Sequence, residues 1–136
     1  MTAVAGDNVE AIRQMWEAYG RRDLDGVLAC IHPDVEWREA VHLFDRGVYR
    51  GHDGIRQLWQ ENDEVFPALQ IDVDDAFDAG DGTVVVIGRF HDSVRGVETT
   101  IRFVHICKLR DGLLAELTEY EDAEQVSALL NARSGS

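Results

Sequence analysis

The hydrophobic and polar positions at the start of the chain follow a helical spacing. Apolar residues recur three and four positions apart between residues 7 and 20, which predicts one helix with a single buried stripe. The members of this stripe are Val9, Ile12, Met15, Trp16 and Tyr19. Asp7 and Glu10 have the spacing of a capping box, so the helix is expected to begin at Asp7.

Three further helices are expected from similar signals. Asp23 can cap a short helix that runs to about Ile31, where the following His-Pro pair ends it. A third helix is expected after the glycine-rich turn at residues 51–54, and Pro67 ends it. A last helix is expected over residues 122–130.

The second half of the chain changes to the alternation of apolar and polar residues that is typical of strands. Strands are expected at residues 35–38, 48–50, 69–77, 83–91, 97–109 and 113–120. Helices that precede an antiparallel sheet indicate the α+β class. We expect a curved antiparallel sheet wrapped around three N-terminal helices, which gives a cone with an apolar interior.

The length and composition of the chain indicate how many domains it forms and where in the cell it is expected. The 136 residues are 45% hydrophobic and 29% charged, as in a globular domain. We expect a single domain over residues 1–136 with an ordered core at about 7–131. The sequence has neither an apolar run that spans a membrane nor the features of a signal peptide, so a cytoplasmic location is expected.

The charge limits the partners. The formal net charge of −13 disfavours nucleic acids and anionic lipid surfaces, and neither is expected as a partner. The densest acidic group is expected to be a solvated strand edge and turn; it consists of Asp72, Asp74, Asp75, Asp78 and Asp81. Cys30 and Cys107 are expected to be buried free thiols.

Four stretches carry a family resemblance, namely Arg22–Gly26, His32–Trp37, Val48–Gly51 and Phe103–Gly112. They resemble the NTF2-like superfamily and, within it, the SnoaL-like and ketosteroid-isomerase-like proteins, over roughly residues 7–125. The resemblance implies a cone-shaped fold with a hydrophobic pocket and a homodimer formed through the sheet. It implies little about function, because the fold hosts several enzyme classes and noncatalytic binding domains.

The resemblance also implies roles for single residues. Ketosteroid isomerases place a general-base aspartate at the end of the first short strand, a position that falls on Glu39 here. Their oxyanion-binding tyrosine falls on Met15, which cannot donate, and Tyr19 is the nearest phenol. Their oxyanion-binding aspartate falls on His105. These departures count against ketosteroid isomerase activity itself.

Three titratable residues are the candidate catalytic groups, and each has an alternative interpretation. His105 lies on an apolar strand face, where it is either an acid or base near neutral pH or a core histidine satisfied by a neighbour. Glu119 either pairs with His105 across adjacent strands or is an exposed acid at a strand end. Glu39 is either a base at the mouth of the cavity or a surface acid paired with Arg38 or Arg46.

Apolar and aromatic residues are expected to form the wall of the substrate site, which suits a hydrophobic, ring-containing ligand. They are Met15, Trp16, Tyr19, Trp37, Trp59, Phe66, Phe90 and Phe103. The face taken by Arg89 and His91 stays open, because a turn of different length would shift the register. The histidines lack the spacing of metal ligands, so no metal and no cofactor are expected.

Two functions therefore stand as hypotheses. The first is a cofactor-independent isomerase, cyclase or dehydratase that acts by proton transfer on a carbonyl or polyketide-like substrate. The second is a noncatalytic ligand-binding or dimerisation domain. A homodimer is expected through the outer sheet face, which carries Arg102, Val104, Ile106 and Lys108.

Overall fold

The computed structural model describes residues 5–39, 47–65, 68–94 and 97–120. Its elements are, in chain order, α1 (Ala5–Gly20), α2 (Leu24–Ala29), β1 (Ile31–Arg38), β2 (Val48–Arg50), α3 (Gly51–Val65), β3 (Gln70–Gly80), β4 (Thr83–Val94), β5 (Val97–Arg110) and β6 (Leu113–Tyr120). The helix expected over residues 122–130 lies outside the described residues.

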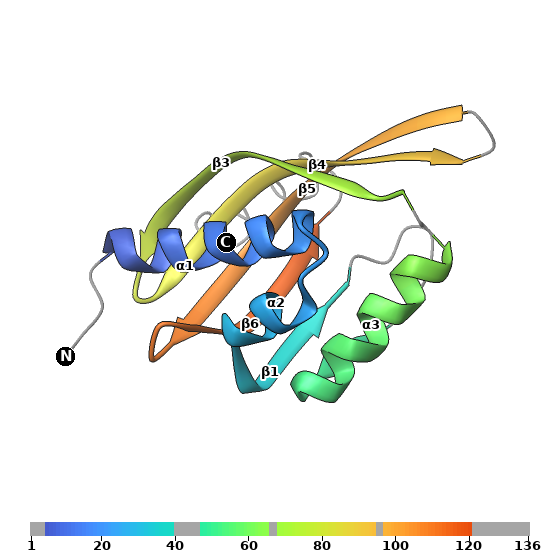
Figure 1. Ribbon diagram of the computed structural model, residues 1–136. Coiled ribbons are helices and arrows are strands. Elements are labelled where there is room, and N and C mark those ends of the chain that lie inside the picture. Colours follow the sequence, from blue (N-terminus) through green and yellow to red (C-terminus); the bar gives the residue numbers. More distant parts are fainter. Residues whose placement is uncertain (1–4, 40–46, 66–67, 95–96, 121–136) are drawn as a thin grey trace.

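The six strands form one curved sheet in the order β2-β1-β6-β5-β4-β3, and the three helices lie on one face of it (Figure 1). This arrangement confirms the predicted α+β class. The sheet is mixed rather than wholly antiparallel, because β1 runs parallel to β6 while all other neighbours are antiparallel. The parallel pair joins the N-terminal strands to the long C-terminal meander.

The first two helices differ from their predicted bounds by a few residues. Helix α1 begins at Ala5, so Asp7 lies within its first turn, where its charge is favourable, and is not the cap. Asp23 does cap α2, because its carboxylate accepts a hydrogen bond from the Gly26 amide at 3.0 Å. Helix α2 ends at Ala29, before the predicted end at Ile31.

Strand β1 begins at Ile31, earlier than the predicted start at residue 35. The amide of Leu114 in β6 donates to the carbonyl of Cys30 at 2.9 Å, which draws this segment into the sheet. Pro33 has no amide hydrogen to donate, and it lies where the register between β1 and β6 is interrupted, between Ile31 and Glu36. The proline is therefore tolerated inside a strand that is paired on both sides.

The register of β5 decides which side chains face the helices. His105 lies opposite Val86 of β4 and Glu119 of β6, and Phe103 lies opposite Gly88. Alternation then places Phe103, His105 and Cys107 together on the inner face, as predicted, and all three are buried.

The thiols differ from each other in burial. Both cysteines are free, as predicted, and Cys107 is fully buried. Cys30 is only partly buried, because it lies at the end of α2, where its thiol donates to the Gly26 carbonyl at 3.5 Å. Among the described helices, none has the length and apolar character needed to cross a membrane.

Candidate functional site

A histidine and a glutamate form a buried pair at the centre of the inner sheet face. The His105 side chain is fully buried, and its Nε2 lies 2.8 Å from Oε1 of Glu119. Their strands are adjacent, and the register places the two residues directly opposite each other. Glu119 is 5% exposed, so it is an interior group and not an exposed acid at a strand end.

Glu39 joins this pair from the end of β1. Its Oε1 accepts a hydrogen bond from the Trp37 indole at 2.9 Å, and its carboxyl group also shares a hydrogen bond with Glu119. Burial raises the pKa of Glu39 to about 8, and the charge of Glu119 and the hydrogen bond with it act in the same direction. Glu39 is therefore protonated at neutral pH, and Glu119 is the carboxylate that accepts from it.

The same carboxylate fixes the tautomer of the histidine. Burial lowers the pKa of His105 to about 3 and outweighs the opposing effect of Glu39, which acts only when that carboxyl group is ionised, so the imidazole is neutral at pH 7. A neutral imidazole that faces the Glu119 carboxylate through Nε2 carries its hydrogen there. The lone pair is then on Nδ1, a buried atom without a hydrogen-bond partner among the described residues.

Aromatic rings surround the imidazole. Phe103 lies closest, with its ring centroid 4.1 Å from that of His105, and Trp16 of α1 stacks on the imidazole at 5.4 Å. Trp37 and Phe90 complete the surroundings at 6.2 and 6.3 Å. His105 is thus held between helix and sheet in an apolar environment, where a proton transfer avoids competition from water.

Three of the remaining residues of the predicted wall, Met15, Tyr19 and Trp59, belong to the core or pack against it. Met15 is 1% exposed and belongs to the core. Tyr19 is buried, and its ring contacts Trp16 at 5.7 Å and Trp59 of α3 at 5.2 Å. Phe66 lies outside the described residues.

The polar role of Trp37 was not predicted from the sequence, which indicated Trp37 only as part of the wall. The signal was present, because residues two apart on a strand point to the same side, and Trp37 and Glu39 have that spacing. The indole nitrogen of Trp16 and the hydroxyl of Tyr19 are buried without a hydrogen-bond partner in the described part of the chain, which the sequence did not predict. Helical spacing predicts that a residue is buried, but not where its polar atom points.

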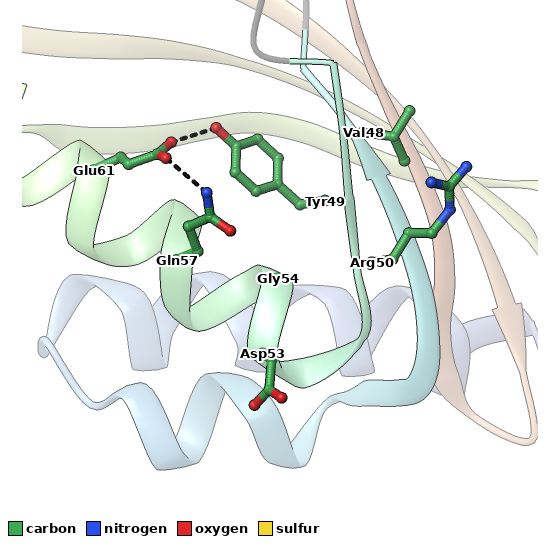
Figure 2. A pocket seen from close by; sticks show the side chains of 7 residues that line it. All are labelled: Val48, Tyr49, Arg50, Asp53, Gly54, Gln57 and Glu61. Carbon is green, nitrogen blue, oxygen red and sulfur yellow. Dashed lines mark hydrogen bonds between the residues drawn. The ribbon is translucent and has the colours of Figure 1, made fainter.

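A separate pocket of about 440 Å³ lies between β2 and the first turns of α3 (Figure 2). Its polar side chains pair largely with each other: the Tyr49 hydroxyl lies 2.5 Å from the Glu61 carboxylate, which also accepts from Gln57 at 3.0 Å. The other lining residues are Val48, Arg50, Asp53 and Gly54. The pocket therefore holds none of the predicted catalytic groups.

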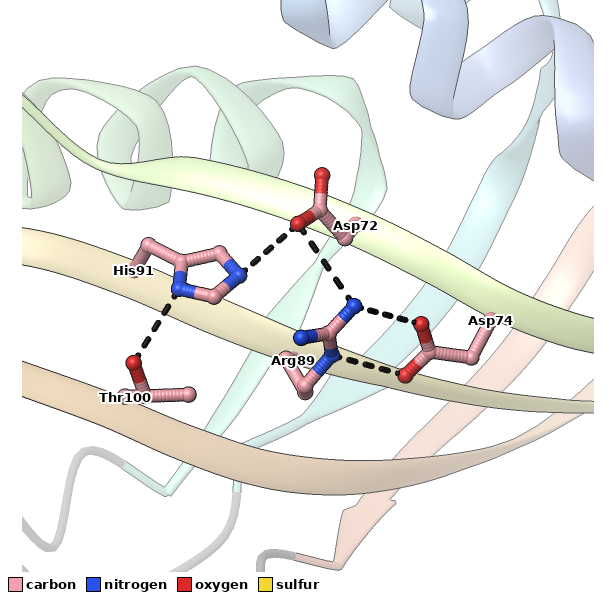
Figure 3. A network of polar contacts seen from close by, with 5 residues as sticks. All are labelled: Asp72, Asp74, Arg89, His91 and Thr100. Carbon is pink, nitrogen blue, oxygen red and sulfur yellow. Dashed lines mark hydrogen bonds and ion pairs between the residues drawn. The ribbon is translucent and has the colours of Figure 1, made fainter.

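The outer sheet face carries a network of charged side chains (Figure 3). Arg89 donates twice to Asp74, at 2.8 and 2.9 Å, and His91 contacts both Asp72 at 2.8 Å and Thr100 at 3.1 Å. The register thus places Arg89 and His91 away from the helices, which settles the face that the sequence left open. It also supports the prediction that this acidic group is a solvated strand edge.

The described residues contain no group of three or more His, Cys, Asp or Glu side chains arranged to hold a metal ion. The inner site offers groups suited to acid–base chemistry: the Glu119 carboxylate is hydrogen-bonded both to the neutral imidazole of His105 and to the protonated carboxyl group of Glu39.

Known proteins match this sequence at the level of family and fold. Residues 12–117 match the family model of the SnoaL-like domain. The structure of TerC co-crystallised with polyporic acid is 28% identical, with a TM-score of 0.76 over 92% of this chain and 98% of that chain. An NTF2-like protein of unknown function from Burkholderia pseudomallei is 27% identical, with a TM-score of 0.76 over 90% of this chain and 96% of that chain.

A more distant structure shares the fold alone. It comes from a Jannaschia species and its name proposes a SnoaL-like polyketide cyclase; it is 18% identical, with a TM-score of 0.73 over 100% of this chain and 97% of that chain. None of the curated proteins matches the sequence at a significant level.

Proposed function

Because this chain belongs to the SnoaL-like domain family, we propose that it binds a small, largely apolar carbonyl compound in its interior and catalyses proton transfer on it. The observation that carries the proposal is the series of hydrogen-bonded groups that runs from the buried His105 and Glu119 to the partly buried Glu39. TerC, a relative in structure, was crystallised with polyporic acid, which supports a small-molecule ligand for this chain as well.

Each of the three groups has a defined part in the proposed reaction. His105 removes a proton through Nδ1, while Glu119 holds the opposite nitrogen and stabilises the imidazolium that forms. The electron pair of the broken C–H bond moves onto the carbonyl oxygen and gives an enolate. Glu39, protonated at neutral pH, is the acid of the cluster. Isomerisation, cyclisation and dehydration all begin with this step.

The experiment follows hydrogen exchange on a simple probe. In deuterated buffer, the wild-type protein is expected to accelerate exchange at C2 of 1-phenylbutane-1,3-dione, measured by NMR. The variant His105→Gln is expected to lose on the order of 100-fold or more of this acceleration, as for loss of a general base. His91→Gln is the matched control, because His91 is also paired with a carboxylate but on the outer face.

Ligand binding without catalysis is the second candidate, and the low pKa of His105 favours it, because an imidazole with a pKa of about 3 is a weak base. Binding of polyporic acid by wild-type protein that does not accelerate exchange on the diketone would support this second function. Equal acceleration of hydrogen exchange by wild type and by His105→Gln would contradict the proposed proton-transfer activity.

We also propose that two copies pair through the outer sheet face. Apolar side chains there are partly exposed on adjacent strands, among them Val85, Ile87 and Ile106, and Phe77 is 43% exposed. The described helices all lie on the opposite face. A second copy would remove these side chains from water.

We propose a cytoplasmic location, and the two free thiols support it, because a reducing compartment preserves unpaired cysteines.

A further inference from the structure

A threonine, a histidine and an aspartate form a hydrogen-bonded row on the outer sheet face (Figure 3). The hydroxyl oxygen of Thr100 lies 3.1 Å from Nδ1 of His91, and Nε2 of the same ring lies 2.8 Å from Oδ2 of Asp72. Hydrolases of unrelated fold join a hydroxyl, an imidazole and a carboxylate in this order to make the hydroxyl a nucleophile. The row therefore has the composition and the order of a nucleophile with its base.

Three neighbouring strands hold the row in place. Asp72 belongs to β3, His91 to β4 and Thr100 to β5, and Thr100 lies directly opposite His91 in the register. On β3, Asp72 lies two residues from Gln70, the residue opposite His91, so it is the diagonal neighbour of the histidine on the same face. The sheet thus brings the three groups together before any reagent binds.

The partners of the imidazole decide where its hydrogen lies. A carboxylate has no hydrogen to donate, so in the neutral ring the hydrogen that faces Asp72 is on Nε2. Nδ1 then carries a lone pair, and the hydrogen in its contact with Thr100 is that of the hydroxyl. The Thr100 hydroxyl therefore donates to a nitrogen that can take its proton when its oxygen attacks.

Two arginines place positive charge beside the row. Arg89 donates twice to Asp74, and its Nη2 also lies 3.8 Å from Oδ2 of Asp72, the carboxylate that faces the histidine. Arg102 is exposed and lies two residues from Thr100 on the same face of β5. Negative charge that develops on a reagent at Thr100 is therefore stabilised by nearby cations.

Solvent reaches all three members of the row. Thr100 is exposed, and the side chains of His91 and Asp72 are 30% and 57% exposed. Thr100 also lies six residues along β5 from Ile106, which is about 20 Å, so it is distant from the middle of the face proposed for pairing. A small reagent can approach the Thr100 oxygen without a cavity and without a movement of the chain.

We propose that Thr100 is an acyl acceptor that reacts with an activated aryl ester, with His91 as the base and Asp72 as the group that holds the imidazole. The Thr100 oxygen forms a bond to the ester carbonyl carbon, and its proton passes to Nδ1 of His91. The bond from that carbon to the aryl oxygen then breaks. The products are an O-acyl threonine and a phenolate, and the proton on His91 is released to solvent.

The experiment uses p-nitrophenyl acetate as the acyl donor. Wild-type protein is expected to release a burst of p-nitrophenolate of about one equivalent per chain, as an acyl group accumulates on the nucleophile. Mass spectrometry of the intact protein is expected to show one added acetyl group. Fragmentation of its proteolytic peptides is expected to place that group on Thr100.

Three variants test the members of the row. Thr100→Val keeps the branched shape and removes the hydroxyl, so the burst is expected to disappear. His91→Gln is expected to slow acylation of Thr100 on the order of 100-fold or more, as for loss of a general base. Asp72→Asn keeps the size but removes the charge that holds the imidazole, so it is expected to slow acylation on the order of tenfold or more.

Two control variants remove the same kinds of group elsewhere. Thr118→Val removes a threonine hydroxyl from β6, and His32→Gln removes an imidazole that accepts from the Asp34 amide. Both are expected to give the wild-type burst. Wild-type protein unfolded in urea is expected to lose the reaction at Thr100, because the three strands no longer hold the row together.

Several results would overturn the proposal. These are no burst from wild type, an acetyl group found on Lys108 or His91 and not on Thr100, or equal rates of acylation for wild type and His91→Gln. Equal reactivity of Thr100 in folded and unfolded protein would also overturn it. The row lies on the opposite sheet face from His105, so the outcome of the hydrogen-exchange assay does not bear on it.

Discussion

At the scale of single residues, the two perturbed groups of the interior change stability with pH in opposite directions. The pKa of Glu39 is raised from 4.5 to about 8, so the folded state holds a proton that the unfolded chain loses across that range. Stability contributed by this group therefore falls as pH rises from about 4.5 to 8. The pKa of His105 is lowered from 6.5 to about 3, so its contribution is lost as pH falls through that range.

Between pH 4.5 and 6.5 the two groups change the free energy of unfolding in opposite directions. Above pH 6.5, of these two groups, Glu39 alone still changes it. We therefore expect the free energy of unfolding of wild type to fall between pH 6.5 and 8, by at most about 1.4 kcal/mol per pH unit. Glu39→Gln replaces the protonated carboxyl with an amide that cannot ionise, so the fall is expected to disappear. Urea unfolding at several pH values measures this pH dependence for wild type and for Glu39→Gln.

Glu116→Gln is the control for this prediction, because it removes an exposed acid of the same sheet, and it is expected to keep the wild-type pH dependence. A wild-type slope that persists in Glu39→Gln would show that Glu39 is not the group responsible.

The sequence predicted one part of this cluster better than the other. Alternation along β5 and β6 was sufficient to bring His105 and Glu119 to the same face, because strands that are regular and adjacent leave few alternatives. Glu39 lies just past the end of β1, and its spacing of two from Trp37 indicates only the contact between these two residues. Its contact with Glu119 depends on the path of the chain in three dimensions, which no local pattern encodes.

At the scale of elements, the close approach of β3, β4 and β5 depends on a glycine. A Cβ atom at Gly88 would lie 2.4 Å from the Asp72 carbonyl oxygen and 2.6 Å from the Phe103 ring. The first obstacle is backbone and cannot move without separating two strands. The second is the ring that packs against His105 at 4.1 Å.

We therefore expect Gly88→Ala to destabilise the protein by about 1–3 kcal/mol, as overpacking does, and to weaken binding of the diketone through displacement of Phe103. Urea unfolding measures the first effect and titration calorimetry the second. Gly20→Ala is the control, because a Cβ there has nothing within 4 Å, and its stability is expected to stay within about 0.5 kcal/mol of wild type. Wild-type stability in Gly88→Ala would mean that the strands separate at little cost.

Element order and type were predictable because long periodic segments dominate this chain, whereas the bounds were not. The region around Pro33 was expected to end a helix and interrupt regular structure, yet Ile31 already belongs to β1. The hydrogen bond from Leu114 to Cys30 draws this segment into the sheet. Its donor lies more than eighty residues away, so no local signal near Pro33 could predict the strand.

At the scale of the whole molecule, the two faces of the sheet carry different kinds of side chain. The inner face carries the buried histidine and its carboxylates, and the outer face carries the Arg89 network beside partly exposed apolar residues. The net charge of −13 favours solubility, but it does not remove these apolar side chains from water. The proposed pairing of the outer faces would remove these apolar side chains from water.

The mass of the protein in solution tests this pairing. Light scattering at micromolar concentration is expected to give twice the chain mass of 15.3 kDa for wild type. Ile106→Lys puts a charge in the middle of the outer face, between Val85 and Thr118, so it is expected to give the mass of one chain. Gln14→Lys adds the same charge on the exposed side of α1 and is expected to stay dimeric. A single-chain mass for wild type would reject the pairing, whereas the His105 cluster lies within one chain and does not depend on it.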